Sequence, residues 1–381
     1  ILPAFATADI KMGVILGFTG PIESLTPDMG GSAEVAFKEA SDSGLLLGGQ
    51  KIVSVRADST CIDNAAATAA AERLVTAEKV AGIMGADCSG VTTAVANNVA
   101  VPNGVPMISP SATSPALTTI ADNGYFFRTA PSDARQGQVL ASITVERGIT
   151  SVAVTYVNSD YGKGLSDSFG KAFQALGGTV TISVPHETGK ADYSAEVASM
   201  DSAGGDAMAV FGYVNQGGPG IMQASLDSGS FDKFILADGM YGDDLLTNVE
   251  GDLTGTFGTV PGTDSKGAAT YADMANAAGL KGSGPFTGES YDAAALLILA
   301  MQSAGSTDGA AIASNVMGVA NAPGEKIMPG ELAKGLRILA NGGAVDYVGA
   351  TNVELTGVGE ASGSYREFEI RNKAFQTVRF R

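Results

Sequence analysis

Residues 51–78, "KIVSVRADSTCIDNAAATAAAERLVTAE", contain a strand, a loop and a helix in direct succession. Residues 51–58 are rich in β-branched side chains, which predicts a strand. Residues 63–78 are rich in alanine and begin at Asp63, a good N-cap residue, which predicts a helix. The same strand–loop–helix pattern recurs through most of the chain, so this unit decides the fold class.

The recurring pattern falls into two sets that are separated near residue 130. In the first set we expect strands at 10–18, 51–58, 80–86 and 105–109, and helices at 30–44, 63–78 and 90–100. In the second set we expect strands at 151–157, 179–184, 207–212 and 233–238, and helices at 164–178, 192–205 and around 221–226. This alternation predicts an α/β fold with two doubly wound, Rossmann-like lobes, each built on a parallel sheet.

The region after residue 255 is different. It contains a strand at 255–260, four helices at 267–279, 289–304, 308–320 and 331–341, and a hairpin at 366–380 around Asn372 and Lys373. Because a lone hairpin is only marginally stable, we expect it to join one of the two sheets.

Composition narrows the range of partners. Hydrophobic residues make up 45% of the 381 residues and charged residues 17%, which is typical of a well-packed globular protein. The net charge of −17 repels phosphate backbones, so we expect no nucleic-acid partner. No run of 18 apolar residues suggests a membrane span, and we interpret 293–301 as a buried core helix.

The N-terminal stretch and the two cysteines indicate export. Small residues at Ala4, Ala6 and Ala8 are typical of the end of a secretory signal, with cleavage after Ala6 or Ala8. The cysteine count is even, with Cys61 and Cys88, which in an exported protein predicts one disulfide. The alternative is two buried free thiols, as expected for a cytosolic protein.

Motifs for enzyme chemistry are absent from the sequence. His186 is the only histidine, which excludes a histidine-rich metal site, and we expect it to be exposed in the polar loop "PHETGK". No G-x-S-x-G, P-loop or G-x-G-x-x-G motif occurs. We therefore expect a protein that is not an enzyme and that needs no cofactor or metal.

Polar residues follow the predicted strands, where open α/β sheets bind their ligands. In the first lobe these are hydroxyls, at Ser89 and in the segment "MISPSATSPALT" (107–118), beside helix N-termini that favour an anion. In the second lobe Asp238 offers a counter-charge for an ammonium group, with Tyr161 and Tyr213 as aromatic walls. The alternative is that the serines are ordinary helix caps.

At these residues the chain resembles the leucine/isoleucine/valine-type periplasmic binding proteins of ABC importers, which have the type I periplasmic binding protein fold. The resemblance covers nearly the whole chain and rests on the order of several short segments: "DSTCIDNAAATAAAERLV", "GADCSGVTTA", "MISPSATSPALT", "FFRTAPSDARQG", "NSDYGKGL", "GESYDAAALL" and "AVDYVGAT". It implies two lobes joined by three hinge crossings, with 9–129 plus 257–346 in one lobe and 130–256 plus 347–381 in the other. It also implies a Cys61–Cys88 disulfide and ligand contacts at Ser89, Ser111, Ala112, Thr113, Tyr161, Tyr213 and Asp238.

The chain departs from the family pattern at the pocket. Asp238 stands where the amino-acid binders often have Glu, and the first loop "PIESLTP" lacks the aromatic residue found in many relatives. We also place Glu23 and Glu289 at the pocket, which favours a larger or more polar ligand than leucine.

From the resemblance we expect a monomeric, periplasmic solute-binding protein that captures a small amino-acid-like ligand between its lobes by hinge closure. It would deliver that ligand to the permease subunits of an ABC importer. The alternatives are a ligand-sensing domain, or a binding protein for amides, urea or aromatic carboxylates.

Overall fold

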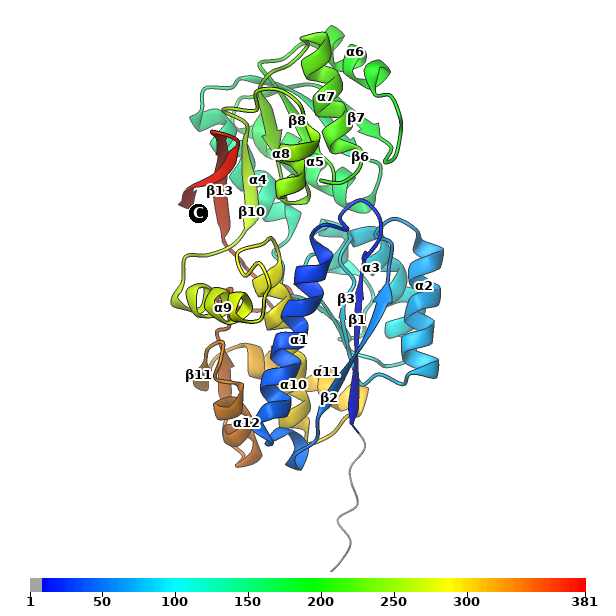
Figure 1. Ribbon diagram of the computed structural model, residues 1–381, viewed down its shortest axis with the longest axis vertical. Coiled ribbons are helices and arrows are strands. Elements are labelled where there is room, and N and C mark those ends of the chain that lie inside the picture. Colours follow the sequence, from blue (N-terminus) through cyan, green and yellow to red (C-terminus); the bar gives the residue numbers. More distant parts are fainter. Residues whose placement is uncertain (1–8) are drawn as a thin grey trace, which may run out of the picture.

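The chain forms two α/β lobes, each built around its own sheet (Figure 1). The computed structural model describes residues 9–381, so the expected cleavage after Ala6 or Ala8 lies outside the described residues. The fold class predicted from the alternating strands and helices is confirmed. Among the described residues, no helix is long and apolar enough to cross a membrane.

The first lobe contains a five-stranded parallel sheet in the order β2-β1-β3-β4-β5. Its strands are β1 (Ile10–Leu16), β2 (Ile52–Asp58), β3 (Ile83–Gly85), β4 (Met107–Ser109) and β5 (Phe126–Arg128). One face packs on α1 (Thr26–Ser43) and α10 (Thr287–Ala304), and the other packs on α2 (Asn64–Glu72) and α3 (Ser89–Val95) (Figure 1). Two short π-helical turns, Arg73–Ala77 and Ala96–Ala100, extend α2 and α3.

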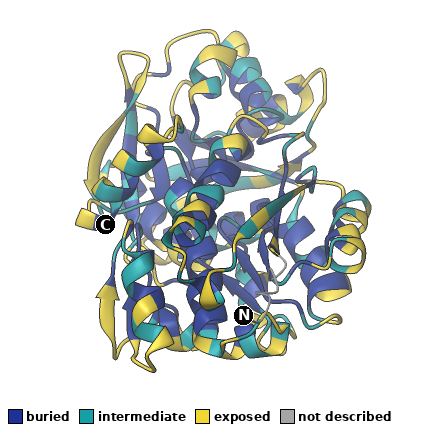
Figure 2. Cartoon of the chain, turned by 60° about the horizontal axis from the view of Figure 1, so that its bottom comes forward, coloured by how far each residue is buried: buried dark blue, intermediate teal, exposed yellow. Residues whose placement is uncertain are grey.

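Helix α10 is the centre of this lobe. Every residue from Tyr291 to Met301 is fully buried, which confirms the predicted core helix. A helix that is apolar on all sides must be covered on all sides. Here α1, α11 (Gly309–Ala320) and α12 (Leu332–Ala340) cover it together with the sheet. Figure 2 shows this buried interior, with exposed residues on the outer helices, the loops and the outermost strands.

The second lobe contains a seven-stranded sheet in the order β14-β13-β10-β9-β8-β6-β7. Five strands are parallel: β6 (Ser151–Val157), β7 (Thr179–His186), β8 (Ala207–Phe211), β9 (Phe234–Leu236) and β10 (Phe257–Pro261). The antiparallel hairpin β13 (Tyr365–Arg371) and β14 (Ala374–Phe380) adds to β10. Its turn residues Asn372 and Lys373 both have positive φ, as a two-residue hairpin turn of type I′ requires. The predicted hairpin is confirmed.

Helices cover both faces of the second sheet. On one face lie α4 (Asp133–Glu146) and α5 (Asp160–Ala175); on the other lie α6 (Ser194–Ala203), α7 (Gly218–Ser228) and α8 (Asp243–Asn248). The chain completes the first lobe with α9 (Lys266–Ala277), α11, α12 and a small parallel pair, β11 (Glu325–Ile327) and β12 (Val345–Tyr347). The chain passes between the lobes at 129–132, 262–265 and 348–364.

One predicted lobe boundary is wrong. Residues 257–261 were assigned to the first lobe, but they form β10, which pairs with β9 and β13 of the second sheet. The boundary therefore falls after Pro261, because the strand must complete its pairing before the chain crosses back. The rest of the lobe division stays a prediction.

Helix α4 was not predicted, because its sequence contains Gly137 and β-branched residues that weaken a helix in isolation. The tertiary structure explains the glycine. A Cβ at Gly137 would lie 2.6 Å from the Phe169 backbone nitrogen, so only glycine permits α4 and α5 to pack this closely. Helix α8 and the short strands β5, β11 and β12 were also missed.

The expectation for His186 is also wrong. This residue ends β7 and is buried, with Nδ1 2.9 Å from the Thr155 hydroxyl. Burial lowers the pKa of His186 to about 4, so the ring is neutral near pH 7. The strand continues two residues further than the sequence pattern indicated and carries the histidine into the interior.

Candidate ligand-binding site

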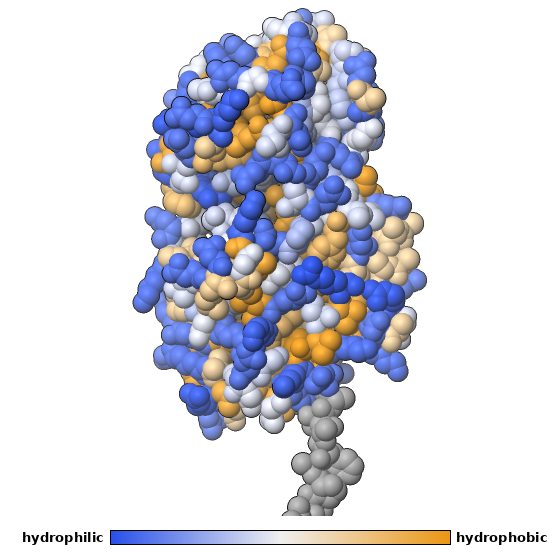
Figure 3. All heavy atoms as spheres, in the orientation of Figure 1, coloured by the Kyte–Doolittle hydropathy of each residue, from blue (hydrophilic) through white to orange (hydrophobic). Residues whose placement is uncertain are grey.

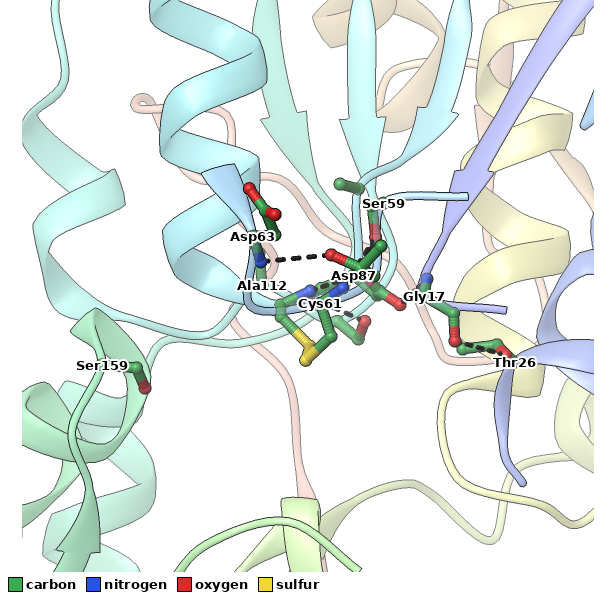
Figure 4. Close-up of a disulfide and its surroundings, with 12 residues drawn as sticks. Gly17, Thr26, Ser59, Cys61, Asp63, Asp87, Ala112 and Ser159 are labelled. Atoms are coloured by element: carbon green, nitrogen blue, oxygen red, sulfur yellow. Dashed lines mark hydrogen bonds between the residues drawn. A yellow bond between two sulfur atoms is a disulfide. The ribbon is translucent and has the colours of Figure 1, made fainter. Parts of the chain in front are cut away.

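A disulfide fixes the loops at the carboxyl end of the first sheet (Figure 4). Cys61 follows β2, Cys88 follows β3, and their sulfurs are 2.03 Å apart, so the predicted pairing is confirmed. Asp87 lies beside the bridge (Figure 4) and accepts hydrogen bonds from the Gly17 N–H, the Ser59 hydroxyl at 3.0 Å and the Cys88 N–H at 2.8 Å. The ends of β1, β2 and β3 are thereby held together.

The serine-rich loop after β4 forms the next part of this wall. Ser111 donates its hydroxyl to the Asp87 carbonyl at 3.2 Å. Ser89, the first residue of α3, accepts the Ser114 N–H on its Oγ at 3.0 Å. Both hydroxyls therefore have partners within the lobe, and both residues also line the cavity between the lobes.

Two buried side chains hold the loop from behind. Ser109 donates to the Ala86 carbonyl at 2.5 Å and accepts the Ala112 N–H at 3.0 Å. Arg128 donates to the carbonyls of Ala112 at 2.9 Å and Ser114 at 2.8 Å, and it pairs with Glu360 at 2.5 Å. A loop fixed in this way costs less entropy when a ligand binds. The helix-cap alternative holds for Ser114, which caps Pro115–Thr119.

The opposite wall comes from the second lobe. Tyr161, in the first turn of α5, and Tyr213, after β8, stack with ring centroids 5.4 Å apart. The Tyr161 hydroxyl donates to Asp238 Oδ1 at 3.3 Å and accepts the Gly239 N–H at 3.2 Å. Asp238 is buried, and burial raises its pKa to about 6. A cationic partner would therefore stabilise the ionised form of this carboxyl.

A second buried carboxyl, Asp133, lies close to Asp238. Among the described residues, neither of its carboxyl oxygens has a hydrogen-bond partner. Burial raises the pKa of Asp133 well above its ordinary value, and the charge of Asp238 raises it further. Sequence reasoning missed this residue, although it lies in the quoted segment "FFRTAPSDARQG".

The two walls enclose a cavity of about 30 Å³ between the lobes. Five predicted residues line it: Ser89, Ser111, Tyr161, Tyr213 and Asp238. Sequence reasoning missed the apolar lining residues Ile22, Leu25, Met29 and Phe286, and also Asp87. Only Asp87 carried a recognisable signal, since it directly follows β3; the apolar residues look like any core residue in the sequence.

Four other predicted residues do not line this cavity. Ala112 and Thr113 are fully buried behind the loop, where Arg128 and Asp133 bind their carbonyls. Glu23 is exposed and accepts the Gly20 N–H at 3.2 Å. Glu289 lines a neighbouring cavity instead. The alternation of buried and lining positions in the loop after β4 cannot be read from its hydroxyl content.

The lobes touch next to Ile22 and Leu25, two residues that line this cavity. The Ser24 hydroxyl donates to Asn215 Oδ1 at 2.9 Å, and the Asn215 N–H donates to the Pro21 carbonyl at 3.0 Å. A cavity of about 30 Å³ holds one or two water molecules. An amino acid therefore requires these contacts to open, or the lining side chains to move. Within 9–381, no cluster of His, Cys, Asp and Glu is suited to a metal ion.

Comparisons with known proteins agree with this architecture. The family model described as "Periplasmic binding protein" matches residues 9–332. The Leu/Ile/Val-binding protein homolog 1 of Brucella abortus is 30% identical over 308 residues, covering 80% of this chain and 81% of the relative. The chemotactic signal transduction system substrate-binding protein BasB of Halobacterium salinarum is 26% identical over 97% of this chain and 88% of its own.

Solved structures share the fold. The leucine-binding protein LivK from Thermotoga maritima superposes with a TM-score of 0.80 at 24% identity, covering 97% of this chain and 98% of that chain. A solute-binding protein from R. palustris in complex with 4-hydroxybenzoate superposes with a TM-score of 0.77 at 19% identity, covering 98% and 97%. The chain belongs to the periplasmic binding protein family.

Proposed function

We propose that this protein captures a small amino-acid-like solute between its lobes and delivers it to an ABC importer. The observation that carries the proposal is the asymmetry of the cavity walls. One wall presents the hydroxyls of Ser89 and Ser111, and the other presents the carboxyl of Asp238. Hydroxyl and N–H groups suit a carboxylate, and a buried carboxyl suits an ammonium group.

Each group of the ligand would have its own contacts. The ligand carboxylate would lie against Ser89 and Ser111, and its ammonium would meet Asp238, which Tyr161 orients. The side chain would lie among Ile22, Leu25, Met29 and Phe286. Thr113 is not part of this assignment, because its hydroxyl lies beside Asp133.

Binding would be coupled to hinge closure. The ligand contacts come from both lobes, so they favour the closed form over an open one. The closed form would be a monomer in the periplasm and would dock on the permease subunits. The protein would have no enzymatic activity. The relatives named Leu/Ile/Val-binding proteins support this proposal.

Thermal unfolding with a panel of L-amino acids, amides and aromatic carboxylates tests it. We expect at least one amino acid to raise the Tm, because a ligand that binds only the folded state stabilises it. The matched control is Glu23→Gln, which removes an exposed carboxylate outside the cavity and should leave the shift unchanged. If amino acids give no shift while an amide or aromatic acid does, the amino-acid assignment fails.

A second candidate is a sensor or a binding protein for aromatic carboxylates. The stacked pair Tyr161 and Tyr213 favours an aromatic ligand, and the R. palustris structure named above contains 4-hydroxybenzoate. The relative BasB is named as a chemotaxis protein, which supports a sensor. The thermal panel separates the ligand classes. Thiol titration with and without reductant separates an exported protein, with Cys61 and Cys88 bridged, from a cytosolic sensor.

A further inference from the structure

A larger cavity lies beside the hinge, next to the one between the lobes. Its volume is about 140 Å³, compared with about 30 Å³ for the inter-lobe cavity, and Phe286 lines both. A single water requires only about 10–15 Å³ by the same kind of measure, so the hinge cavity has room for a small organic molecule. Its walls come from the end of β10, helix α9, the first turn of α10 and strand β13.

One wall carries a buried carboxyl that forms no ion pair. Glu289, in the first turn of α10, is 5% exposed and takes part in none of the ion pairs found among residues 9–381. Burial raises its pKa to about 8. Its backbone carbonyl accepts the Thr129 hydroxyl at 2.8 Å, which fixes this turn to the hinge. Leaving a carboxyl buried without a partner is costly unless a ligand supplies one.

Another wall carries a guanidinium with no carboxylate partner. Arg366, on β13, has its carbon Cζ 4.7 Å from the Tyr241 ring centroid, and its Nε is buried without a hydrogen bond within the described chain. By contrast, Arg147, which follows α4, and Arg379, on the neighbouring strand β14, both pair with Glu367, at 3.0 Å in each case. Arg366 is near enough to act on the charge of Glu289, yet the two do not form an ion pair.

We propose that the hinge cavity is a second ligand site, for a small amino-acid zwitterion whose carboxylate binds Arg366 and whose ammonium binds Glu289. Bidentate recognition of a carboxylate is the interaction for which a guanidinium is best suited. Both charges of such a molecule would find an opposite charge, and both side chains would gain the partner that the protein does not supply.

The position of the cavity gives this site a consequence for hinge motion. It is lined by Gly262 and Thr263 at the second crossing and by Pro261, the last residue of β10. A small adjoining cavity, also lined by Glu289, touches Thr129 and Pro131 at the first crossing and Gly363 and Ser364 at the third. A molecule held between Glu289 of the first lobe and Arg366 of the second would therefore restrict changes in the angle between the lobes.

Isothermal titration with glycine tests the site, in an Asp238→Asn background so that binding in the inter-lobe cavity is weakened. We expect one binding event in Asp238→Asn, weakened at least tenfold by adding Glu289→Gln or Arg366→Gln. Ala268→Leu fills the cavity without removing a charge and should also weaken glycine. Arg366→Lys serves as a second variant if Arg366→Gln does not fold, which circular dichroism reports.

Two results would overturn the proposal. One is the absence of a glycine-binding event in Asp238→Asn; the other is an event that Glu289→Gln and Ala268→Leu leave unchanged. Methylamine and acetate, each with one half of the zwitterion, should bind at least tenfold more weakly than glycine. Equal binding of acetate would contradict the zwitterion assignment. Failure of the inter-lobe proposal would appear separately, as a Tm shift with amino acids that Asp238→Asn leaves unchanged.

Discussion

The hydroxyl of Tyr161 lies 3.3 Å from Oδ1 of Asp238, and the same hydroxyl accepts the N–H of Gly239 at 3.2 Å. The backbone N–H therefore orients the phenol so that its proton points to the carboxyl. Tyr161 belongs to the first turn of α5 and Asp238 follows β9, so the contact joins two strand–helix junctions of the second lobe. It holds Asp238 in place while leaving its charge without a cationic partner.

The affinity for an amino acid should fall as the pH drops below about 6. Burial raises the pKa of Asp238 to about 6, and only the ionised form attracts an ammonium group. Below that pH the affinity should decline toward about tenfold per pH unit. Titration calorimetry across this range measures the effect. Asp238→Asn should give a flat profile over the same range, and a flat wild-type profile would exclude Asp238 as the counter-charge.

Replacing Asp133 with Asn should stabilise the protein near neutral pH. A carboxyl whose pKa is raised by folding binds its proton more tightly in the folded state. Its contribution to stability therefore falls as pH rises from the ordinary value of 3.8 through the folded value. We expect a gain of about 1–3 kcal/mol that is larger near neutral pH than in acid.

Urea unfolding of wild type and Asp133→Asn at an acidic and a neutral pH checks this prediction. Asp167→Asn is a matched control, because its carboxylate is exposed on α5. A loss of stability in Asp133→Asn at neutral pH would contradict this prediction, because it would mean that the folded protein stabilises the carboxyl.

Arg128→Met should destabilise the protein strongly and loosen the ligand site. The change removes the donors for the carbonyls of Ala112 and Ser114 and leaves Glu360 without its partner. Breaking a buried ion pair in this way costs about 3–5 kcal/mol. Urea unfolding measures the loss, and Arg73→Met, whose pair with Glu78 is on the surface, should cost less than about 1 kcal/mol. Equal losses would contradict the supporting role of Arg128.

Removing the disulfide should lower the free energy of unfolding but change the ligand affinity little. Replacing both Cys61 and Cys88 with Ala opens a loop with a sequence separation of 27 residues, which costs about 3–4 kcal/mol in the chain-entropy model. Asp87 still holds the ends of β1, β2 and β3 by hydrogen bonds, so the wall should persist. Urea unfolding and calorimetry of the double variant test both parts. Loss of binding in a folded variant would show that the hydrogen bonds alone cannot hold the loops.

Sequence patterns predicted most of the fold, because the β-branched strand pattern of 151–157 and the uninterrupted apolar run of 293–301 are strong local signals. Elements that depend on tertiary contacts were missed. Helix α4 contains Gly137, which weakens a helix in isolation but permits close packing on α5, and β5 has only three residues. His186 was misplaced because one polar segment contains both the end of β7 and the loop that follows.

The site was predicted in part for similar reasons. Ser89, Ser111, Tyr161, Tyr213 and Asp238 follow strands directly, and the parallel sheet brings strand ends to one edge. Residues that reach the cavity from α1 and from the turn before α10, such as Met29 and Phe286, carry no such positional signal. The orientation of Thr113 and Glu289 depends on the path of the loop and on helix packing, which local sequence does not specify.

The role of Asp238 as the counter-charge for an ammonium group is the central claim, and one comparison tests it most directly. Titration calorimetry should compare the amino acid that gives the largest thermal shift with its deaminated analogue, in wild type and in Asp238→Asn. Removing one partner of a buried charge pair costs about 2–5 kcal/mol, so Asp238→Asn should weaken the amino acid at least about 30-fold. The analogue, which lacks the ammonium, should change little. Equal weakening of both ligands, or of neither, would contradict the account.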